Sequence, residues 1–399
     1  MNDEVPKWWR DSVVYHIYPL GYCGAPDHNN LRDSPVSRLA AIERRLESIR
    51  EMGFTALYLG PLFESTSHGY DTVDYYRVDR RLGDGDDLRR LVDRAHALGI
   101  RVMLDGVFNH VGRAFWAFRH LRDHGEVSPY RSWFRDIDFA ADSRYGDGFS
   151  YRDWEGTDTL VTLNHDEPAV VDHLLSAVDE AVRRYDIDGL RLDVAYLLPR
   201  GFLGELRARV DALKGEFLLL GEFIHGDYDG ALRAGTLDSV TNYQGYKALW
   251  SAHNDGNYFE LAHTLGRLAD TRLYNFVDNH DVDRVVDRLD EPDHRFPVHA
   301  LLFTMPGVPS VYYGSEVGAR GRKADGDRSL RPSIDAVESR ESTDYRLREF
   351  ITELAEMRSR SRALRRGEYR PLLVRPTQFA FLRSLDCEAV VVMVNADAD

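Results

Sequence analysis

Cysteine is almost absent from the chain, and this scarcity narrows the classes of protein to which it can belong. Its two cysteines, Cys23 and Cys387, lie near opposite ends of the sequence. A lone pair so far apart does not make a disulfide framework, so we expect unpaired thiols in a reducing compartment. The first nine residues also lack the apolar core of a secretory signal. The sequence therefore predicts a cytoplasmic protein.

Long hydrophobic runs and an excess of positive charge are also missing. No run of about 18 apolar residues occurs, so we expect no membrane-spanning helix and no membrane partner. The 51 Lys and Arg are outnumbered by 66 Asp and Glu, which gives a formal net charge of −15. Binding to nucleic acid depends on clustered Lys and Arg, so nucleic acid is not an expected partner. An acidic surface does not repel a neutral sugar.

What the sequence does contain is a regular alternation of strand and helix patterns. Such alternation indicates a parallel sheet in the α/β class. Eight repeats predict a (β/α)8 TIM barrel, which carries its chemistry at the C-terminal ends of the strands. The expected strands are 12–18, 55–59, 100–104, 188–192, 217–220, 238–243, 273–277 and 309–313, and the expected helices are 36–52, 86–98, 167–185, 201–213, 258–268, 297–304 and 345–362.

Two segments depart from this alternation. Residues 111–165 are rich in aromatic residues, Gly and Asp, and a long irregular insertion in a regular fold is usually functional or disordered. We interpret it as an insertion subdomain over the active site, after strand 3. Residues 367–399 change to a β-rich pattern and predict a short C-terminal antiparallel β-domain, either abbreviated or truncated. Residues 1–110 and 166–366 are then the catalytic barrel.

Three carboxylates give the strongest indication of chemistry. Asp193, Glu222 and Asp281 each follow a short apolar run that is typical of a buried strand. An acid in this position fits poorly with core packing, but it fits the catalytic end of a barrel. Glycoside hydrolysis requires a carboxylate and a carboxylic acid on either side of the scissile bond. The three acids therefore predict a glycosidase.

The first two acids suit the two chemical roles. Arg191 and Asp193 share one face of their strand, and a buried arginine favours the charged carboxylate that a nucleophile needs. Taken alone, such a pair is more often structural. Strands lie roughly 4.8 Å apart, which allows Glu222 the roughly 5–5.5 Å carboxyl separation of a retaining enzyme. Negative neighbours in a partly dry pocket favour a protonated Glu222, as a general acid requires.

Other polar and aromatic residues are candidates for contacts with the sugar. Asp281, with His280 beside it, is predicted to grip sugar hydroxyls more tightly as positive charge develops on the ring. His110 is a candidate hydrogen-bonding partner, or else a histidine that supports the pocket from behind. Tyr70 is a candidate stacking platform, or else a buried aromatic residue. Asp105 is expected to stiffen the pocket.

These residues fall into motifs that resemble the α-amylase family of glycoside hydrolases. Four motifs match in order, and together at this spacing they are highly specific. They are Asp105–His110 (DGVFNH), Gly189–Asp193 (GLRLD), Gly221–Phe223 (GEF) and Phe276–Asp281 (FVDNHD), with secondary matches at 68–75 and 307–316.

The resemblance implies roles for particular residues. It implies Asp193 as nucleophile, Glu222 as acid and base, and Asp281 as stabiliser of the transition state. The subsite for the attacked glucose would be lined by Tyr70, His110, Arg191 and His280. The chain is most similar to the neopullulanase and cyclomaltodextrinase group, but its barrel starts without the N-terminal β-domain that this group uses to dimerise. The oligomeric state stays open.

The predicted activity is retaining hydrolysis of α-1,4-glucosidic bonds in malto-oligosaccharides, with cyclodextrins or pullulan as further substrates. A transglycosylase with the same residues, a non-catalytic sugar-binding barrel and a metal-dependent hydrolase are the alternatives. No organic cofactor is implied. The oxygen-rich loop with Asp27, Asn29 and Asn30 is a candidate for calcium, but it is more typical of a plain polar turn.

Overall fold

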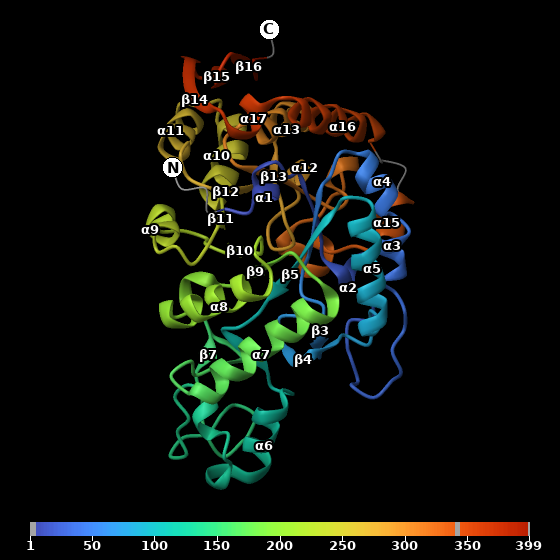
Figure 1. Cartoon of the computed structure of the whole chain (residues 1–399), viewed down its shortest axis with the longest axis vertical. Coiled ribbons are helices and arrows are strands. Elements are labelled where there is room, and N and C mark those ends of the chain that lie inside the picture. The colour runs from blue at the N-terminus through green and yellow to red at the C-terminus, as the bar shows by residue number, and fades with distance from the viewer. Residues whose placement is uncertain (1–4, 340–343, 398–399) are drawn as a thin grey trace.

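The computed structural model describes residues 5–339 and 344–397, and its centre is a closed barrel of eight parallel strands (Figure 1). The predicted (β/α)8 fold is confirmed. In order around the barrel the strands are β1 (Val14–Ile17), β2 (Ala56–Leu59), β5 (Arg101–Gly106), β9 (Gly189–Leu192), β10 (Leu218–Gly221), β11 (Ser239–Thr241), β12 (Leu273–Phe276) and β13 (Val308–Tyr312).

The strands are apolar because they are covered on both faces. Alternating side chains of β1, β2, β5, β10, β12 and β13 form one buried cluster. Trp9 belongs to this cluster, and its ring stacks on the ring of Tyr274. The opposite faces join a larger cluster with the surrounding helices. The main helices of that layer are α5 (Gly85–Ala97), α7 (Pro168–Tyr185), α8 (Arg200–Leu213), α10 (Tyr243–Asn254), α11 (Tyr258–Leu268), α13 (Arg295–Thr304) and α16 (Tyr345–Arg360).

Two predicted elements were wrong in detail. The helix expected over 36–52 is two short helices, α3 (Ala40–Glu43) and α4 (Leu46–Glu51). Residues 36–39 lie outside them, and the N–H groups of Val36 and Leu39 donate to the Arg80 and Leu82 carbonyls. The strand expected over 238–243 ends at Thr241 as β11. Asn242 instead caps α10, a helix that was not predicted, by accepting the Gly245 N–H.

The segment between β5 and α7 forms a small projecting unit. It contains β6 (His110–Gly112), α6 (Trp116–His124), β7 (Asp153–Trp154) and β8 (Thr157–Thr162), whose strands pair in the order β6-β8-β7.

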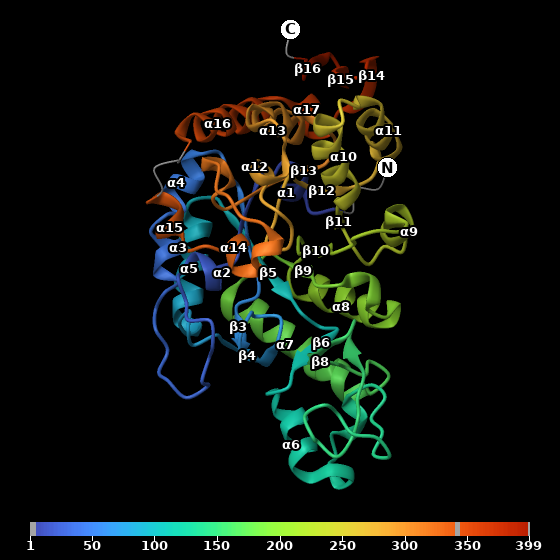
Figure 2. The same ribbon diagram turned by 180° about the vertical axis from the view of Figure 1, so that it is seen from behind.

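An antiparallel ribbon of β3 (Phe63–Ser65) and β4 (Thr72–Val78), which was not predicted, follows β2. Figure 2 shows this ribbon and the unit with α6 near the same end of the molecule. The connection between β3 and β4 carries His68 and Tyr70.

At the opposite end of the molecule from α6 lies a three-stranded antiparallel sheet (Figure 1). Its strands are β14 (Glu368–Val374), β15 (Gln378–Leu385) and β16 (Glu388–Asn395). The exact division of the chain into domains stays a prediction. The remaining helices are short: α1 (Lys7–Arg10), α2 (Pro19–Tyr22), α9 (Tyr228–Arg233), α12 (Val285–Arg288), α14 (Asp327–Leu330), α15 (Ile334–Glu338) and α17 (Arg362–Arg366). Within residues 5–339 and 344–397, no helix is long and apolar enough to cross a membrane.

Candidate active site

One buried guanidinium group gathers three carboxylates at the ends of neighbouring barrel strands. Arg191 Nη1 lies 2.8 Å from Asp105 Oδ1 and 2.8 Å from Asp193 Oδ1. Its Nη2 lies 2.7 Å from Glu222 Oε1. All four side chains are buried. Asp193 and Glu222 therefore lie in the same buried cluster, at the ends of the adjacent strands β9 and β10.

The backbone at the end of β9 fixes the relative placement of these acids. The Asp193 N–H donates to the Gly106 carbonyl at 3.0 Å, and the Glu222 N–H donates to the Leu192 carbonyl at 2.9 Å, so both acids extend the ladder of the barrel. Val194 then turns into the left-handed region with φ of 41°, a costly conformation for a β-branched residue. Its N–H donates to Glu222 Oε2 at 2.9 Å. The strained turn thus ties Glu222 to the residue after Asp193.

The charge on Asp193 differs from the sequence prediction. Burial raises the pKa of Asp193 well above its ordinary value, Arg191 opposes this, and the nearby Glu222 and Asp105 carboxylates add to it. The sequence indicated the Arg191 contact but not that one guanidinium is shared among three acids. The positive charge of Arg191 does not offset the burial of Asp193 beside two other carboxylates, so the expectation of a readily ionised Asp193 was wrong.

Asp281 has the opposite electrostatic setting. Burial would raise its pKa, but the His280 imidazole, at 2.9 Å, and the Arg331 guanidinium, at 3.0 Å, outweigh burial and hold the pKa of Asp281 below its ordinary range. Its N–H donates to Asn279 Oδ1 at 2.8 Å. Asp281 is therefore a charged carboxylate at neutral pH, with its side chain one-third exposed.

Tyr70 connects the carboxylates around Arg191 with His280 and Asp281. Its hydroxyl donates to Asp105 Oδ2 at 3.0 Å and also contacts His280 Nε2, against whose ring it stacks at 5.6 Å. His110 lies on the other side, with Nε2 3.9 Å from Asp193 Oδ2. Burial lowers the pKa of His110 to about 3, so the ring is neutral at physiological pH. All seven residues predicted for the site thus lie in one connected cluster.

Three residues of the cluster were not predicted. Arg331, in the loop after β13, contacts Asp281 and donates through Nε to the His280 carbonyl at 3.0 Å. Tyr58 donates to Asp105 Oδ2 at 3.0 Å, and the Tyr243 hydroxyl lies 3.5 Å from Glu222 Oε1. Tyr58 lies on the same inward face of β2 as Ala56. The alternation of side chains along this strand could therefore have predicted that Tyr58 reaches the site. Nothing in the sequence around Arg331 distinguishes it from the other arginines of that loop.

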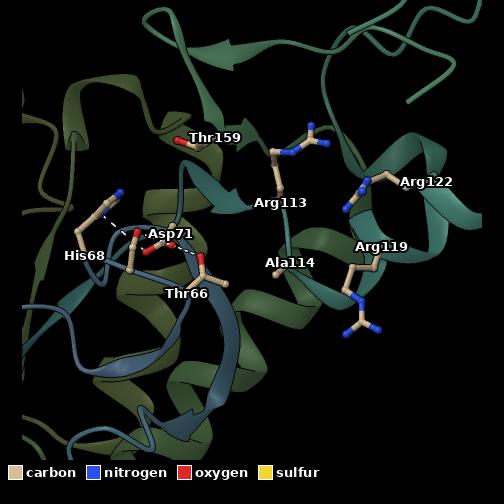
Figure 3. Close-up of a pocket in the computed structure, with 9 residues that line it drawn as sticks. Thr66, His68, Asp71, Arg113, Ala114, Arg119, Arg122 and Thr159 are labelled. Atoms are coloured by element: carbon tan, nitrogen blue, oxygen red, sulfur yellow. Dashed lines mark hydrogen bonds and ion pairs between the residues drawn. The ribbon is translucent and has the colours of Figure 1, made fainter. Parts of the chain in front are cut away.

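A cavity of about 380 Å³ lies beside this cluster, between the β3–β4 connection and α6 (Figure 3). Figure 3 shows His68, Thr66 and Asp71 on one side of it, and Arg113, Arg119 and Arg122 on the other. The three catalytic candidates do not line it. It therefore adjoins the β3–β4 connection that carries Tyr70, but it is not the place where the three acids meet.

The candidate calcium loop is engaged in turn hydrogen bonds. Asn29 Oδ1 accepts the Leu31 N–H at 2.8 Å, and Asn30 Oδ1 accepts the Arg32 and Asp33 N–H groups at 3.0 Å. These are the bonds of polar turns. Among residues 5–339 and 344–397, no group of three or more His, Cys, Asp or Glu side chains is placed to hold a metal ion.

Comparison with known proteins identifies the family. The α-amylase catalytic-domain family model matches residues 27–366. The chain belongs to the α-amylase family. It is 31% identical to a cyclomaltodextrinase of a Bacillus species over 99% of this chain and 74% of that protein. It is 32% identical to neopullulanase 2 of Thermoactinomyces vulgaris over 98% of this chain and 70% of that protein.

Solved structures agree with this family assignment. The cyclic α-maltosyl-(1→6)-maltose hydrolase of Arthrobacter globiformis, in complex with that sugar, superimposes with a TM-score of 0.88 at 29% identity. The alignment covers 98% of this chain and 92% of that one. The chain is thus a glycoside hydrolase acting on α-glucans, and the predicted resemblance is confirmed.

Proposed function

We propose that this family member is a retaining hydrolase of α-1,4-glucosidic bonds in malto-oligosaccharides, with cyclodextrins and pullulan as further substrates. The observation that carries the proposal is the sharing of Arg191 between Asp193 and Glu222. It brings two carboxyl groups to one buried guanidinium, and double displacement at an anomeric carbon requires two carboxyl groups close together. The similarity to enzymes named cyclomaltodextrinase and neopullulanase supports the substrate class.

In the first step, an Asp193 oxygen forms a bond to the anomeric carbon while the bond to the leaving oxygen breaks. Glu222 gives its proton to that oxygen. We assign the proton to Glu222, because general-acid catalysis requires a donor beside the leaving oxygen and Asp193 must attack as the carboxylate. In the second step, Glu222 takes a proton from water, and the hydroxyl oxygen displaces Asp193 from the anomeric carbon.

The other residues act on the sugar rather than on the proton. Asp281 is a fixed negative charge that favours the positive charge of the oxocarbenium-like transition state. His280, which contacts both Tyr70 and Asp281, is placed to bind sugar hydroxyls. The neutral His110 ring, whose buried Nε2 makes no hydrogen bond among the described residues, offers such a contact beside Asp193. Arg331 keeps Asp281 charged.

Product chromatography with maltotriose, β-cyclodextrin and pullulan tests the proposal. Hydrolysis is expected to give maltose and glucose as short products, with the α-anomer first detected by NMR. Products longer than the substrate at high oligosaccharide concentration would favour the transglycosylase. Binding of maltotriose by Asp193→Asn, with no cleavage by the wild type, would favour a sugar-binding barrel. Loss of activity in chelator would favour a metal-dependent enzyme.

We also propose a cytoplasmic location and no organic cofactor. The location is supported by the unpaired Cys23 and Cys387 and by the 28% identity to a protein named intracellular maltogenic amylase of Bacillus subtilis. The absence of a cofactor follows from the reaction, in which Asp193, Glu222 and water supply every group that is transferred. Fractionation of the native cells would test the location.

A further inference from the structure

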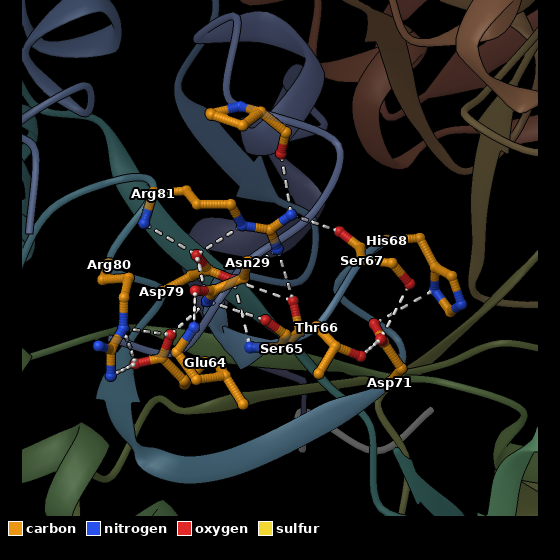
Figure 4. A network of polar contacts seen from close by, with 12 residues as sticks. Asn29, Glu64, Ser65, Thr66, Ser67, His68, Asp71, Asp79, Arg80 and Arg81 are labelled. Carbon is orange, nitrogen blue, oxygen red and sulfur yellow. Dashed lines mark hydrogen bonds and ion pairs between the residues drawn. The ribbon is translucent and has the colours of Figure 1, made fainter. Parts of the chain in front are cut away.

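A buried arginine outside the catalytic cluster lies at the centre of six oxygen contacts. Arg81 follows β4, and its side chain is 5% exposed. Nε and Nη2 bind the two oxygens of Asp79 at 2.9 and 2.7 Å, and Nη2 also binds Ser65 Oγ at 2.9 Å. Nη1 donates to three main-chain carbonyls, those of Pro26, Asp27 and Ser67, at 3.0, 3.1 and 2.7 Å. Figure 4 shows Arg81 with Asp79, Ser65 and Ser67 around it.

The oxygens around Arg81 resemble the coordination shell of a hard cation. A fully buried carboxylate, a hydroxyl and three carbonyls are the ligand types that Ca²⁺ takes, six to eight at a time. Here a guanidinium supplies the positive charge instead, and it repels any further cation. The neighbouring Arg80 pairs with a different carboxylate, that of Glu64, at 3.0 Å. The charge of Asp79 is therefore balanced by Arg81.

The contacts of Arg81 join two segments that are distant in sequence. Pro26 and Asp27 belong to the loop after α2, whereas Ser65 and Ser67 belong to the end of β3 and the connection that follows it. The next carbonyl of that connection, on His68, accepts the Tyr18 hydroxyl at 2.6 Å. Two residues further on, Tyr70 reaches Asp105 and His280. The anchored backbone therefore leads directly to a residue of the site.

We propose that Arg81 is a positioning residue that acts as an internal cation, in the place of a metal ion, and holds the 65–71 connection so that Tyr70 meets the substrate. This inference rests on the proposed function only for the role of Tyr70. Arg81 does not touch the reacting atoms. Its removal leaves Asp79, which is 0% exposed, without its ion-pair partner, facing the hydroxyl and the three carbonyls that now bind Arg81.

Arg81→Ala tests the proposal in chelator and in millimolar CaCl₂. In chelator we expect a lower Tm and a rise of about 10- to 100-fold in the KM for maltotriose, with kcat changed less than KM, because displacement of a binding residue by about 1 Å has effects of this size. Calcium should restore both Tm and KM in the variant and leave the wild type unchanged. Calorimetric titration should show Ca²⁺ binding to the variant alone. Arg80→Ala is the matched control and should not respond to calcium.

Several outcomes would overturn the proposal. If Arg81→Ala has the Tm and KM of the wild type, Arg81 has no positioning role. If the variant has a lower Tm but neither binds Ca²⁺ nor recovers its Tm and KM in Ca²⁺, Arg81 does not stand in for a metal ion. If Arg81→Ala does not fold, Arg81→Lys retains the charge with fewer donors. It should raise KM with little loss of kcat, and an unchanged KM would contradict the proposal. Calcium binding and Tm need no activity, so they distinguish this failure from failure of the proposed function.

Discussion

Asp193 is a buried carboxyl group whose environment serves catalysis at the expense of stability. Because its pKa is raised in the folded state by burial and then by Glu222 and Asp105, its contribution to stability is complete below its unfolded pKa, near 4. That contribution is lost as pH rises toward the folded pKa. The wild type therefore carries a penalty at neutral pH that it lacks in acid.

Asp193→Asn should remove this penalty. We expect the variant to be more stable than the wild type at pH 7, and the difference to shrink toward pH 4. Urea unfolding at both pH values measures it. Asp211→Asn, on an exposed side chain of α8, should change stability little. Equal effects of Asp193→Asn at the two pH values would contradict the assigned electrostatics.

Glu222 gives a second prediction at the scale of one residue. Glu222→Gln removes the proton donor, so kcat on maltotriose should fall roughly 10²–10⁴-fold. The loss should be much smaller on an aryl α-maltoside whose leaving group needs little protonation. Steady-state kinetics on the two substrates make the comparison. Glu216→Gln, on an exposed residue just before β10, is the control. Similar losses on both substrates would count against Glu222 as the acid.

At the scale of elements, the close approach of β9 and β10 sets the distance between the two acids. Gly189 pairs with Leu218, and a Cβ added at Gly189 would lie 2.7 Å from Leu218 Cβ and 2.8 Å from the Leu218 carbonyl oxygen. The backbone oxygen cannot rotate away, so a larger residue must push the strands apart. Glycine at this position keeps Asp193 and Glu222 on the same guanidinium.

Gly189→Ala should therefore lower both stability and kcat. Overpacking of this kind costs about 1–3 kcal/mol, and a misplacement of about 1 Å between reacting groups costs about 10²-fold in rate. Denaturant unfolding and kcat on maltotriose check the two effects. Gly201→Ala in α8 has open space around the added methyl group and should retain full activity. A fully active Gly189→Ala enzyme would show that the strand spacing is not limiting.

At the scale of the whole molecule, the buried Arg383 connects the C-terminal sheet with the barrel, and a second buried arginine, Arg358, lies near it. Arg383 on β15 donates to the Thr304 carbonyl, at the end of α13, at 2.6 Å, and to the Gly367 carbonyl at 2.9 Å. Arg358 on α16 donates to the Phe303 carbonyl at 2.9 Å. Burial, and then the nearby Arg383, lowers the pKa of Arg358 to about 9. The sheet is thus attached through Arg383 at the carbonyl of Thr304, at the end of α13.

Arg383→Met should destabilise the protein without changing its chemistry. The carbonyls of Thr304 and Gly367 lose charged donors worth about 1.5–3 kcal/mol each, and relief of repulsion at Arg358 offsets part of this. We expect a net loss of about 2 kcal/mol with kcat and KM unchanged, because the sheet lies away from the site. Urea unfolding and kinetics test it, with the exposed Arg370→Met as control. A stabilised variant would mean that the buried charge outweighs its bonds.

The sequence by itself determined the eight-stranded barrel and brought Asp193, Glu222 and Asp281 to one end of it. Apolar runs followed by acids are local patterns, and parallel strands of a barrel place their ends together whatever the loops do. The sequence also placed Arg191 beside Asp193, since side chains two apart on a strand share a face. The α10 helix escaped prediction because Asn242, the last residue but one of a predicted strand, proved to be its cap.

Only the tertiary structure decided the electrostatics and the loop contacts. The pKa of Asp193 depends on how many acids share Arg191, and that number follows from the spacing of three strands rather than from any one motif. Arg331 and Arg81 come to Asp281 and to Pro26 from loops 50 and 55 residues away in sequence. Such contacts leave no periodic trace, because loops fold by long-range hydrogen bonding and burial rather than by a repeating pattern.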